Sequence, residues 1–395
     1  MNGLSLTTAV PRNRLASPSR YAQAYDVCVE KTRRTIVALA DSPKSGAFAA
    51  DGNYFAFEEG FFEIGNWTSS FFTGMALLAL QSTKDLTFLQ QINRLSDVYS
   101  EKITTHGRNT MHDLGFLFSL YSVPLHQLTG CPAHRRTGIH AADTLAKRFD
   151  VRGNYIQAWG PMDDVTTSYA GLAIIDCMMN LPLLFWASRE TGNRFYAEIA
   201  IAHAETTLKH FIRPDDSVCH AFRFDLKTGK PVGPDNYCGH AVESHWARGT
   251  TWAIYGFALA YRHTGKRRFL DASLRLAKKF TALLDDEWVP VWDFKLPSDL
   301  PPLRDSSAAA IAVCAFDELL EHHTDPALAE VAEALLDRLC SPTYLDTDSN
   351  CLGVLREGEV GDGVGKAKSV YTSWGDYYFM EALARRVHGL SPHWR

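Results

Sequence analysis

One carboxylate in the sequence lies in an unusually apolar setting. Asp176 stands within Ala-Ile-Ile-Asp-Cys-Met-Met-Asn-Leu, inside a largely apolar stretch over residues 170–187. An ionised carboxylate in such surroundings is costly unless it is paired. Burial should raise its pKa, which suits a group that must hold a proton near neutral pH. We predict that Asp176 is a general acid; the alternative is a structural ion pair or hydrogen bond in the core.

Other polar and aromatic side chains recur where apolar helices are predicted to begin. If these helices run parallel, the side chains meet at one end, where the helix dipoles favour a bound anion. Helix capping is the alternative for each Asp, Ser or Asn, and it is the preferred interpretation for Asp305-Ser306 and Ser373. The groups are Asn66-Trp67, His112-Asp113, Trp246 with Arg248, Asp305-Ser306, and Trp374 with Asp376.

Several further residues are candidates for substrate contacts. Asn180 follows Asp176 by four residues, so we expect it on the same helix face, either orienting the carboxylate, touching substrate or serving as a core amide. His220 follows a loop and could exchange a proton near neutrality, or lie on the surface. Arg248 stands between two tryptophans, a mixture that suits an acidic sugar. The rings that could stack on sugars, although each is more commonly a core residue, are Trp67, Trp159, Trp246 and Trp252.

Apolar residues recur at helical spacings from about residue 19 to the end of the chain. Mostly apolar segments span about 67–81, 113–128, 172–190, 246–263, 306–321 and 373–387. Amphipathic segments span about 19–39, 84–102, 134–149, 193–211, 267–284 and 326–340. A helix that is apolar all round is buried, whereas an amphipathic one lies outside. We therefore predict an all-α fold, an (α/α)6 barrel of six inner and six outer helices, forming one domain over 19–395 behind an N-terminal tail over 1–18.

Two long connections carry little helical pattern. Segment 212–245 predicts a β-hairpin or loop over the barrel mouth, and segment 341–372 is rich in glycine. Long connections of this kind in compact domains are commonly functional.

Composition excludes several classes of function. The net charge is −5 and no basic stripe is present, so no nucleic-acid partner is expected. The sequence has no HExxH or similar ligand spacing, so no metal is expected. Asp176, Asn180 and Pro182 interrupt the longest apolar stretch, which argues against a membrane span. The eight scattered cysteines predict reduced thiols, and the first residues lack a signal-peptide pattern, so we expect a cytoplasmic protein.

At these residues the chain resembles glycoside hydrolase family 88, from about residue 20 to the end. The matching stretches are Asn66-Trp-Thr-Ser-Ser-Phe-Phe-Thr-Gly74, His112-Asp-Leu-Gly-Phe116, Ile175-Asp-Cys-Met-Met-Asn-Leu-Pro-Leu-Leu184, Trp246-Ala-Arg-Gly249 with Trp252, and Ser373-Trp-Gly-Asp-Tyr-Tyr-Phe379.

The resemblance implies an (α/α)6 barrel, no cofactor, and unsaturated glucuronyl hydrolase activity. Such an enzyme releases the terminal 4,5-unsaturated uronic acid from oligosaccharides made by polysaccharide lyases, by hydrating the C4–C5 double bond. Asp176 would be the general acid/base and Asp113 the second essential carboxylate. The resemblance also implies substrate contacts at Trp67, Trp159, His220, Arg248 and Trp252.

The chain departs from the family pattern at Cys238-Gly239, where many relatives have a Gln before the Gly. Cysteine is a poor hydrogen-bond partner for a sugar, so substrate preference could shift. The alternative functions are an unsaturated rhamnogalacturonyl hydrolase, a sugar epimerase with a His pair on the same barrel, and a non-catalytic glycan-binding barrel. Binding alone seldom justifies burying Asp176, which argues against the last.

Overall fold

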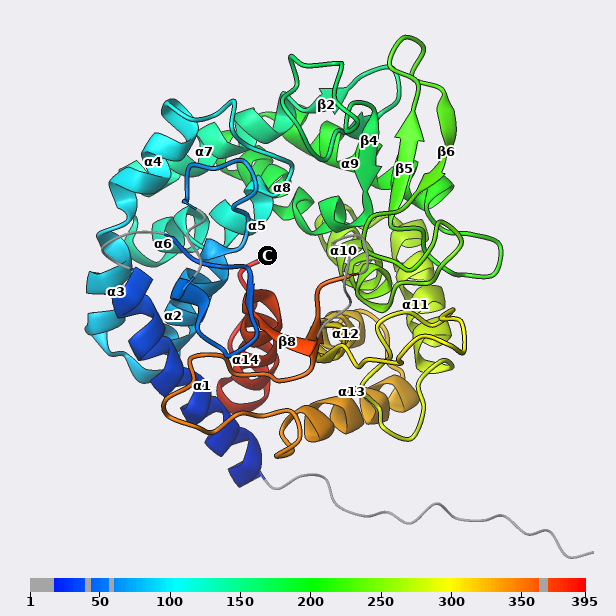
Figure 1. Cartoon of the computed structure of the whole chain (residues 1–395). Helices are drawn as coiled ribbons and strands as arrows, with labels where there is room; N and C mark the ends of the chain where they lie inside the picture. Colours follow the sequence, from blue (N-terminus) through cyan, green and yellow to red (C-terminus); the bar gives the residue numbers. More distant parts are fainter. Residues whose placement is uncertain (1–17, 40–43, 57–59, 362–368) are drawn as a thin grey trace, which may run out of the picture.

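The computed structural model describes residues 18–39, 44–56, 60–361 and 369–395, and within them the helices form two concentric layers (Figure 1). Each inner helix packs on the next, and the last packs on the first, so the ring is closed. The helices facing the centre are α2 (Ser69–Thr83), α5 (Leu114–Ser119) with α6 (Ser122–Thr129), α8 (Leu181–Thr191), α10 (Ala247–Thr264), α12 (Ser306–Leu320) and α14 (Ser373–His388).

The outer layer consists of the amphipathic helices. In α11 the buried positions, including Phe269, Ser273, Leu276 and Phe280, recur at three- and four-residue spacing, so one stripe faces the inner ring. In α12, by contrast, almost every side chain is buried. The (α/α)6 prediction is therefore confirmed. The outer helices are α1 (Pro18–Leu39), α3 (Leu86–Asn93), α4 (Ser96–Thr104), α7 (Pro132–Ala146), α9 (Arg194–His210), α11 (Arg267–Thr281) and α13 (Pro326–Leu339).

Three predicted helices are divided in the structure. The segment predicted as one helix over 172–190 begins as strand β4 (Leu172–Ile174) and a 3-10 turn, η2 (Ile175–Met179), before α8 starts. Pro182 lies in the first turn of α8, where its fixed φ and missing N–H favour a helix start rather than a helix interior. The segment 84–102 divides into α3 and α4, and 113–128 into α5 and α6.

Short antiparallel sheets cover the end of the barrel where the inner helices begin. Strands β4, β5 (Ala221–Phe224) and β6 (Pro231–Asp235) form one sheet, so the hairpin predicted within 212–245 is present. Strands β1 (Phe48–Ala49), β8 (Ser369–Thr372) and β7 (Gly358–Glu359) form another, beside the 3-10 turn η1 (Tyr54–Ala56). Strands β2 (Phe149–Asp150) and β3 (Tyr155–Ile156) form a third. Of the predicted N-terminal tail, residues 1–17 lie outside the described residues, as do Gly363 and Gly365.

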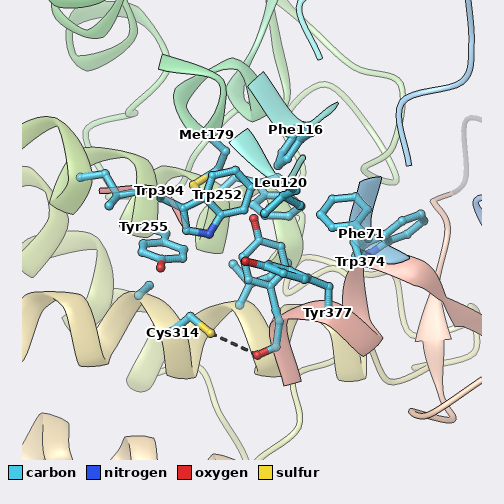
Figure 2. Packing of buried hydrophobic residues seen from close by; sticks show 14 of the residues in the cluster. Phe71, Phe116, Leu120, Met179, Trp252, Tyr255, Cys314, Trp374, Tyr377 and Trp394 are labelled. Atoms are coloured by element: carbon cyan, nitrogen blue, oxygen red, sulfur yellow. Dashed lines mark hydrogen bonds between the residues drawn. The ribbon is translucent and has the colours of Figure 1, made fainter. Parts of the chain in front are cut away.

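The C-terminal segment enters the centre of the barrel (Figure 1). The Trp394 indole stacks on Tyr378, with ring centroids 5.9 Å apart, and its Nε1 donates to Glu381 at 2.9 Å. The aromatic side chains around it form the tightly packed interior shown in Figure 2. This packing fills the barrel beneath its mouth. No helix among the described residues is long and apolar enough to cross a membrane.

Candidate active site

A cavity of about 590 Å³ lies at the end of the barrel where the inner helices begin. Helix starts, the residues that flank the β5–β6 hairpin and the segment after β3 all contribute to its wall. The sequence prediction that side chains at the helix starts meet at one end of the barrel is therefore confirmed. The predicted residues that line the cavity are Trp67, Asp113, Trp159, Asp176, His220, Trp246, Arg248 and Trp374.

Asp176 lies on η2, between the strand that pairs with β5 and the start of α8. Its side chain is 13% exposed, and its Oδ2 atom has no hydrogen-bond partner. Burial raises the pKa of Asp176 from 3.8 to about 7, although the charge of Arg248 acts in the opposite direction. The carboxyl can therefore carry a proton near neutrality and present it to the cavity.

His220 lies beside Asp176 in the cavity wall, with its Nε2 3.7 Å from Oδ2 of the carboxyl. The backbone N–H groups of Tyr237 and Cys238 both donate to Nδ1, each at 3.1 Å. Nδ1 must therefore be an acceptor, which places the ring proton on Nε2, directed at Asp176. Burial lowers the pKa of His220 to about 3, so the ring is neutral at physiological pH.

Asp113 is the residue immediately before α5, and it is buried. Its pKa is raised well above the usual value, first by burial and then by the nearby charge of Asp176. Arg148 and a hydrogen bond from the Asn180 amide act in the opposite direction. The His112 ring lies 3.4 Å from the carboxyl and is itself neutral, because burial lowers its pKa. The two carboxyls thus form an interacting pair.

Arg248 brings a cation to the cavity wall. Its guanidinium pairs with Asp305 at 2.6 Å and donates to the backbone carbonyl of Glu359. The rings of Trp246 and Trp374 lie 4.7 and 5.1 Å from the guanidinium carbon. Asp305 also accepts from backbone N–H groups at the start of α12, so the predicted capping role is confirmed and is combined with holding Arg248.

Aromatic rings form much of the remaining wall. The Trp67 indole stacks on Trp374 at 5.3 Å, with 20° between the ring planes. On the other side, the ring centroid of Trp159 lies 4.9 Å from that of Tyr237 and 5.6 Å from that of Tyr169. Flat rings of this kind suit the apolar faces of sugars. Tyr169 and Tyr237 have no recognisable signal in the sequence, because both lie in irregular segments without a repeating pattern.

Asn180 lies behind the cavity wall, which favours the core-amide alternative over the predicted contact with substrate. It is fully buried, accepts from the Phe116 N–H at 2.8 Å and donates to the Asp176 carbonyl at 3.3 Å. The expected shared helix face with Asp176 is absent because η2 is a 3-10 turn rather than an α-helix. Asn180 therefore joins α5 to η2 and supports Asp113 from below.

Trp252 is also in the core rather than in the cavity, which corrects its predicted place. It is fully buried and packs against Phe116, with ring centroids 5.4 Å apart (Figure 2). Arg248 occupies the first turn of α10, and Trp252 follows one turn deeper, beneath the wall. Asp376 is likewise structural, since it accepts from Tyr54 and from the N–H groups of Val354 and Leu355.

Comparison with known proteins now places the chain. A model of Glycosyl Hydrolase Family 88 matches residues 55–391. The chain belongs to glycosyl hydrolase family 88. It is accordingly a glycoside hydrolase, and the resemblance predicted from the sequence is confirmed.

Two relatives match most of the chain. Unsaturated glucuronyl hydrolase of Bacillus sp. (strain GL1) is 34% identical over 83% of this chain and 88% of that protein. Unsaturated chondroitin disaccharide hydrolase of Streptococcus pyogenes serotype M1 is 35% identical over 83% of each protein.

Solved structures of unsaturated glucuronyl hydrolases have the same barrel. The unsaturated glucuronyl hydrolase of Bacillus sp. GL1, described as responsible for the degradation of glycosaminoglycan, has a TM-score of 0.86 at 32% identity, covering 95% of this chain and 98% of that one. An aspartate-to-asparagine variant of the Streptococcus agalactiae enzyme, complexed with dGlcA-GalNAc6S, has a TM-score of 0.80 at 25% identity, covering 97% and 95%.

The described part of the chain contains no cluster of three or more His, Cys, Asp or Glu side chains that could hold a metal ion. All eight cysteines are free thiols. Burial raises the pKa of the cavity-lining Cys238 to about 12, so this side chain is a neutral thiol.

Proposed function

We propose that this protein removes the terminal 4,5-unsaturated uronic acid from oligosaccharides produced by polysaccharide lyases, including those from glycosaminoglycans. The names of its family 88 relatives support this substrate class. The shape of the site agrees, because the barrel beneath the cavity is filled by the C-terminal segment, and a cavity closed below suits a chain end.

The observation that carries the proposal is the environment of Asp176. A carboxyl that lines a sugar-sized cavity, has a pKa near 7 and is not fully hydrogen-bonded is suited to deliver a proton. A carboxyl that is ion-paired and fully hydrogen-bonded is less able to donate a proton to a substrate. Asp176 is therefore the general acid in the proposed reaction.

The reaction begins when Asp176 transfers its proton to C4 and the double-bond electrons form the new C4–H bond. C5 becomes an oxocarbenium-like centre conjugated with the ring oxygen, which the carboxylates nearby stabilise. Water then adds at C5, and its released proton returns to Asp176. The hemiketal opens by breaking the bond between C5 and the ring oxygen, which leaves a ketone at C5 and a hemiacetal at C1. Collapse of that hemiacetal releases the neighbouring sugar, with one water consumed overall.

The surrounding residues bind and orient the sugar in this proposal. The His220 Nε2–H faces Asp176, so it can hydrogen-bond the carboxylate that forms after proton transfer. Arg248 supplies positive charge for the uronic-acid carboxylate, while Trp67 and Trp159 cover the ring faces. Asp113, beside Asp176, supports the positive charge that develops on the ring.

The alternatives predict different chemistry. An epimerase would need a histidine pair facing the sugar, whereas His220 is the histidine among the described cavity-lining residues. An unsaturated rhamnogalacturonyl hydrolase would share the hydration chemistry and differ in the neighbouring sugar.

The test uses two matched substrates. The first is an oxygen-linked unsaturated disaccharide, and the second is the same compound with a carbon link at the anomeric position. Hydration predicts that the wild type removes the ultraviolet absorbance of the double bond in both, and that Asp176→Asn removes it in neither. If the wild type consumes the first and leaves the carbon-linked compound untouched, the bond is attacked at the anomeric carbon and the hydration mechanism is wrong.

A panel of lyase products then defines the substrate. Unsaturated disaccharides from chondroitin, hyaluronan, heparin, gellan, xanthan and rhamnogalacturonan are compared by kcat/KM. Consumption of glucuronyl products supports the proposal, and preference for the rhamnogalacturonan product favours the alternative.

A further inference from the structure

Arg148 is a buried cation whose hydrogen-bond partners are backbone carbonyls. It follows α7 and is 3% exposed. Among the described residues no carboxylate lies within ion-pair distance of it, although a buried guanidinium without such a partner is costly. Its donors reach the carbonyl oxygens of Gln157 at 2.8 Å, Thr110 at 2.9 Å, Ala158 at 3.1 Å and Gly160 at 2.9 Å.

These carbonyls belong to the two segments that build one wall of the cavity. Residues 157–160 carry Trp159 and Gly160, both of which line it. Thr110 stands three residues before Asp113. The two segments also bond to each other directly, since the His112 N–H donates to the Ala158 carbonyl at 3.0 Å. The planar guanidinium therefore fixes the wall that bears Trp159 against the segment that bears Asp113.

The charge of Arg148 also acts on Asp113. The groups that face Asp113 are the Asp176 carboxyl, the Arg148 guanidinium, the Asn180 amide and the neutral His112 ring. Nearby, the thiol of Cys177 is neutral because burial raises its pKa, and the buried His203 ring is neutral because burial lowers its pKa to about 3. Arg148 is thus the cation that stabilises the ionised form of Asp113.

We propose that Arg148 is a positioning residue of this active site: it fixes the wall that carries Trp159 against the segment that carries Asp113, and its charge favours the ionised form of Asp113. Two interacting carboxyls titrate as a pair, and a cation beside one of them favours charge on that member. Arg148 and the Asn180 amide favour charge on Asp113. This inference rests on the proposed function.

The test separates the two roles of Arg148 with two substitutions. Arg148→Lys keeps the charge but cannot reach four carbonyls, because an ammonium has three donors and no planar fork. We expect KM for an unsaturated disaccharide to rise about fivefold or more, with the acid limb of the pH profile of kcat/KM unchanged. Arg148→Gln removes the charge, so Asp113 should take up its proton more readily. We expect the acid limb to move to higher pH by about one unit, a roughly tenfold loss of kcat/KM on that limb.

Arg213→Gln is the matched control for loss of a guanidinium. Arg213 donates to the backbone carbonyls of Ser244 and Val242, away from the two aspartates. We expect this variant to unfold at a lower temperature while its acid limb stays in place. If Arg148→Lys moves the acid limb as far as Arg148→Gln does, or if Arg213→Gln moves it equally, the electrostatic role is refuted.

A second readout does not depend on activity. In the Asp176→Asn background, infrared difference spectroscopy follows the carboxyl of Asp113 with and without Arg148→Gln. We expect the titration midpoint of Asp113 to be higher when Arg148 is replaced, and equal midpoints would overturn the inference. If the wild-type protein leaves every unsaturated oligosaccharide unchanged, the proposed function is refuted. The infrared titration would still test whether Arg148 favours the ionised form of Asp113.

Discussion

Buried carboxyls at the mouth of the barrel and in its deeper interior have very different surroundings. In the interior, Glu381 accepts hydrogen bonds from Tyr255 and Tyr377, each at 2.7 Å, and from Trp394 at 2.9 Å. At the mouth, Asp176 leaves Oδ2 without a donor and faces an open cavity. Burial raises the pKa of both groups. The difference therefore lies in hydrogen bonding: the Glu381 carboxylate joins three core side chains, while the Asp176 carboxyl lines the cavity and is not fully hydrogen-bonded.

The largest effect should come from exchanging each carboxyl for its amide. Asp176→Asn removes the acid, and we expect kcat on an unsaturated disaccharide to fall by roughly 10²–10⁴-fold. Glu381→Gln keeps an acceptor oxygen and does not touch the cavity, so its kcat should remain within about threefold of the wild type. Steady-state assays by double-bond absorbance measure both, with circular dichroism as a check of folding. Equal losses in the two variants would remove the distinction between the two regions.

Stability should respond in the opposite order. Glu381→Leu leaves the donors of Tyr255, Tyr377 and Trp394 buried without an acceptor, at about 1–3 kcal/mol for each unsatisfied group. We expect the thermal unfolding midpoint to fall by several degrees, as measured by calorimetry. Asp176→Leu leaves no such donors and should lower the midpoint little or not at all. A larger fall for Asp176→Leu than for Glu381→Leu would contradict the comparison.

The pH dependence of stability sharpens the same contrast. The pKa of Asp176 is raised from 3.8 in the unfolded chain to about 7 in the folded one. Its stabilising contribution is therefore complete below about pH 4 and is lost as pH rises towards 7, because the unfolded chain ionises first. We expect Asp176→Asn to match the wild type near pH 4 and to exceed it in unfolding free energy at pH 8. Urea titrations at both values measure this, and parallel curves would exclude a raised pKa at Asp176.

The smallest effect concerns Cys238, which lines the cavity beside His220. Its thiol is a weak hydrogen-bond partner, and Cys238→Gln would place an amide there. One added hydrogen bond to the sugar is worth about 1 kcal/mol, so we expect KM to fall by roughly fivefold with kcat nearly unchanged. Cys238→Ser, which is close in size, serves as the control. An unchanged or higher KM in the Gln variant would show that this position does not contact substrate.

Much of the site can be predicted from the sequence because many of its side chains lie at the starts of helices. Asp113 directly precedes α5 and Arg248 lies in the first turn of α10, so a correct assignment of the helices brings them to one end. Asp176 was identified through its apolar neighbours, although it lies on a 3-10 turn rather than the predicted helix. The pattern of apolar residues reports burial but does not distinguish a strand and turn from a buried helix over a few residues.

The residues that were misplaced or missed depend on distant contacts. Trp252 resembles a sugar-stacking residue in sequence, but its depth along α10 places it under the cavity wall. Arg148 follows an outer helix, where a cation would ordinarily be exposed. Its hydrogen-bond acceptors are backbone carbonyls of Thr110 and of residues 157–160. The direction of the His220 ring proton is set by backbone N–H groups of residues 237 and 238. No local sequence pattern predicts such contacts between distant segments.

The protonation of Asp176 is the quantity that the whole account requires. Infrared difference spectroscopy of the wild type against Asp176→Asn isolates this one carboxyl and follows it from pH 4 to pH 9. We predict that the protonated carboxyl persists at pH 6 and disappears with a midpoint of about 7, as burial dictates. A carboxyl already ionised at pH 5 would contradict the account, because no proton would then be held at the cavity for transfer to C4.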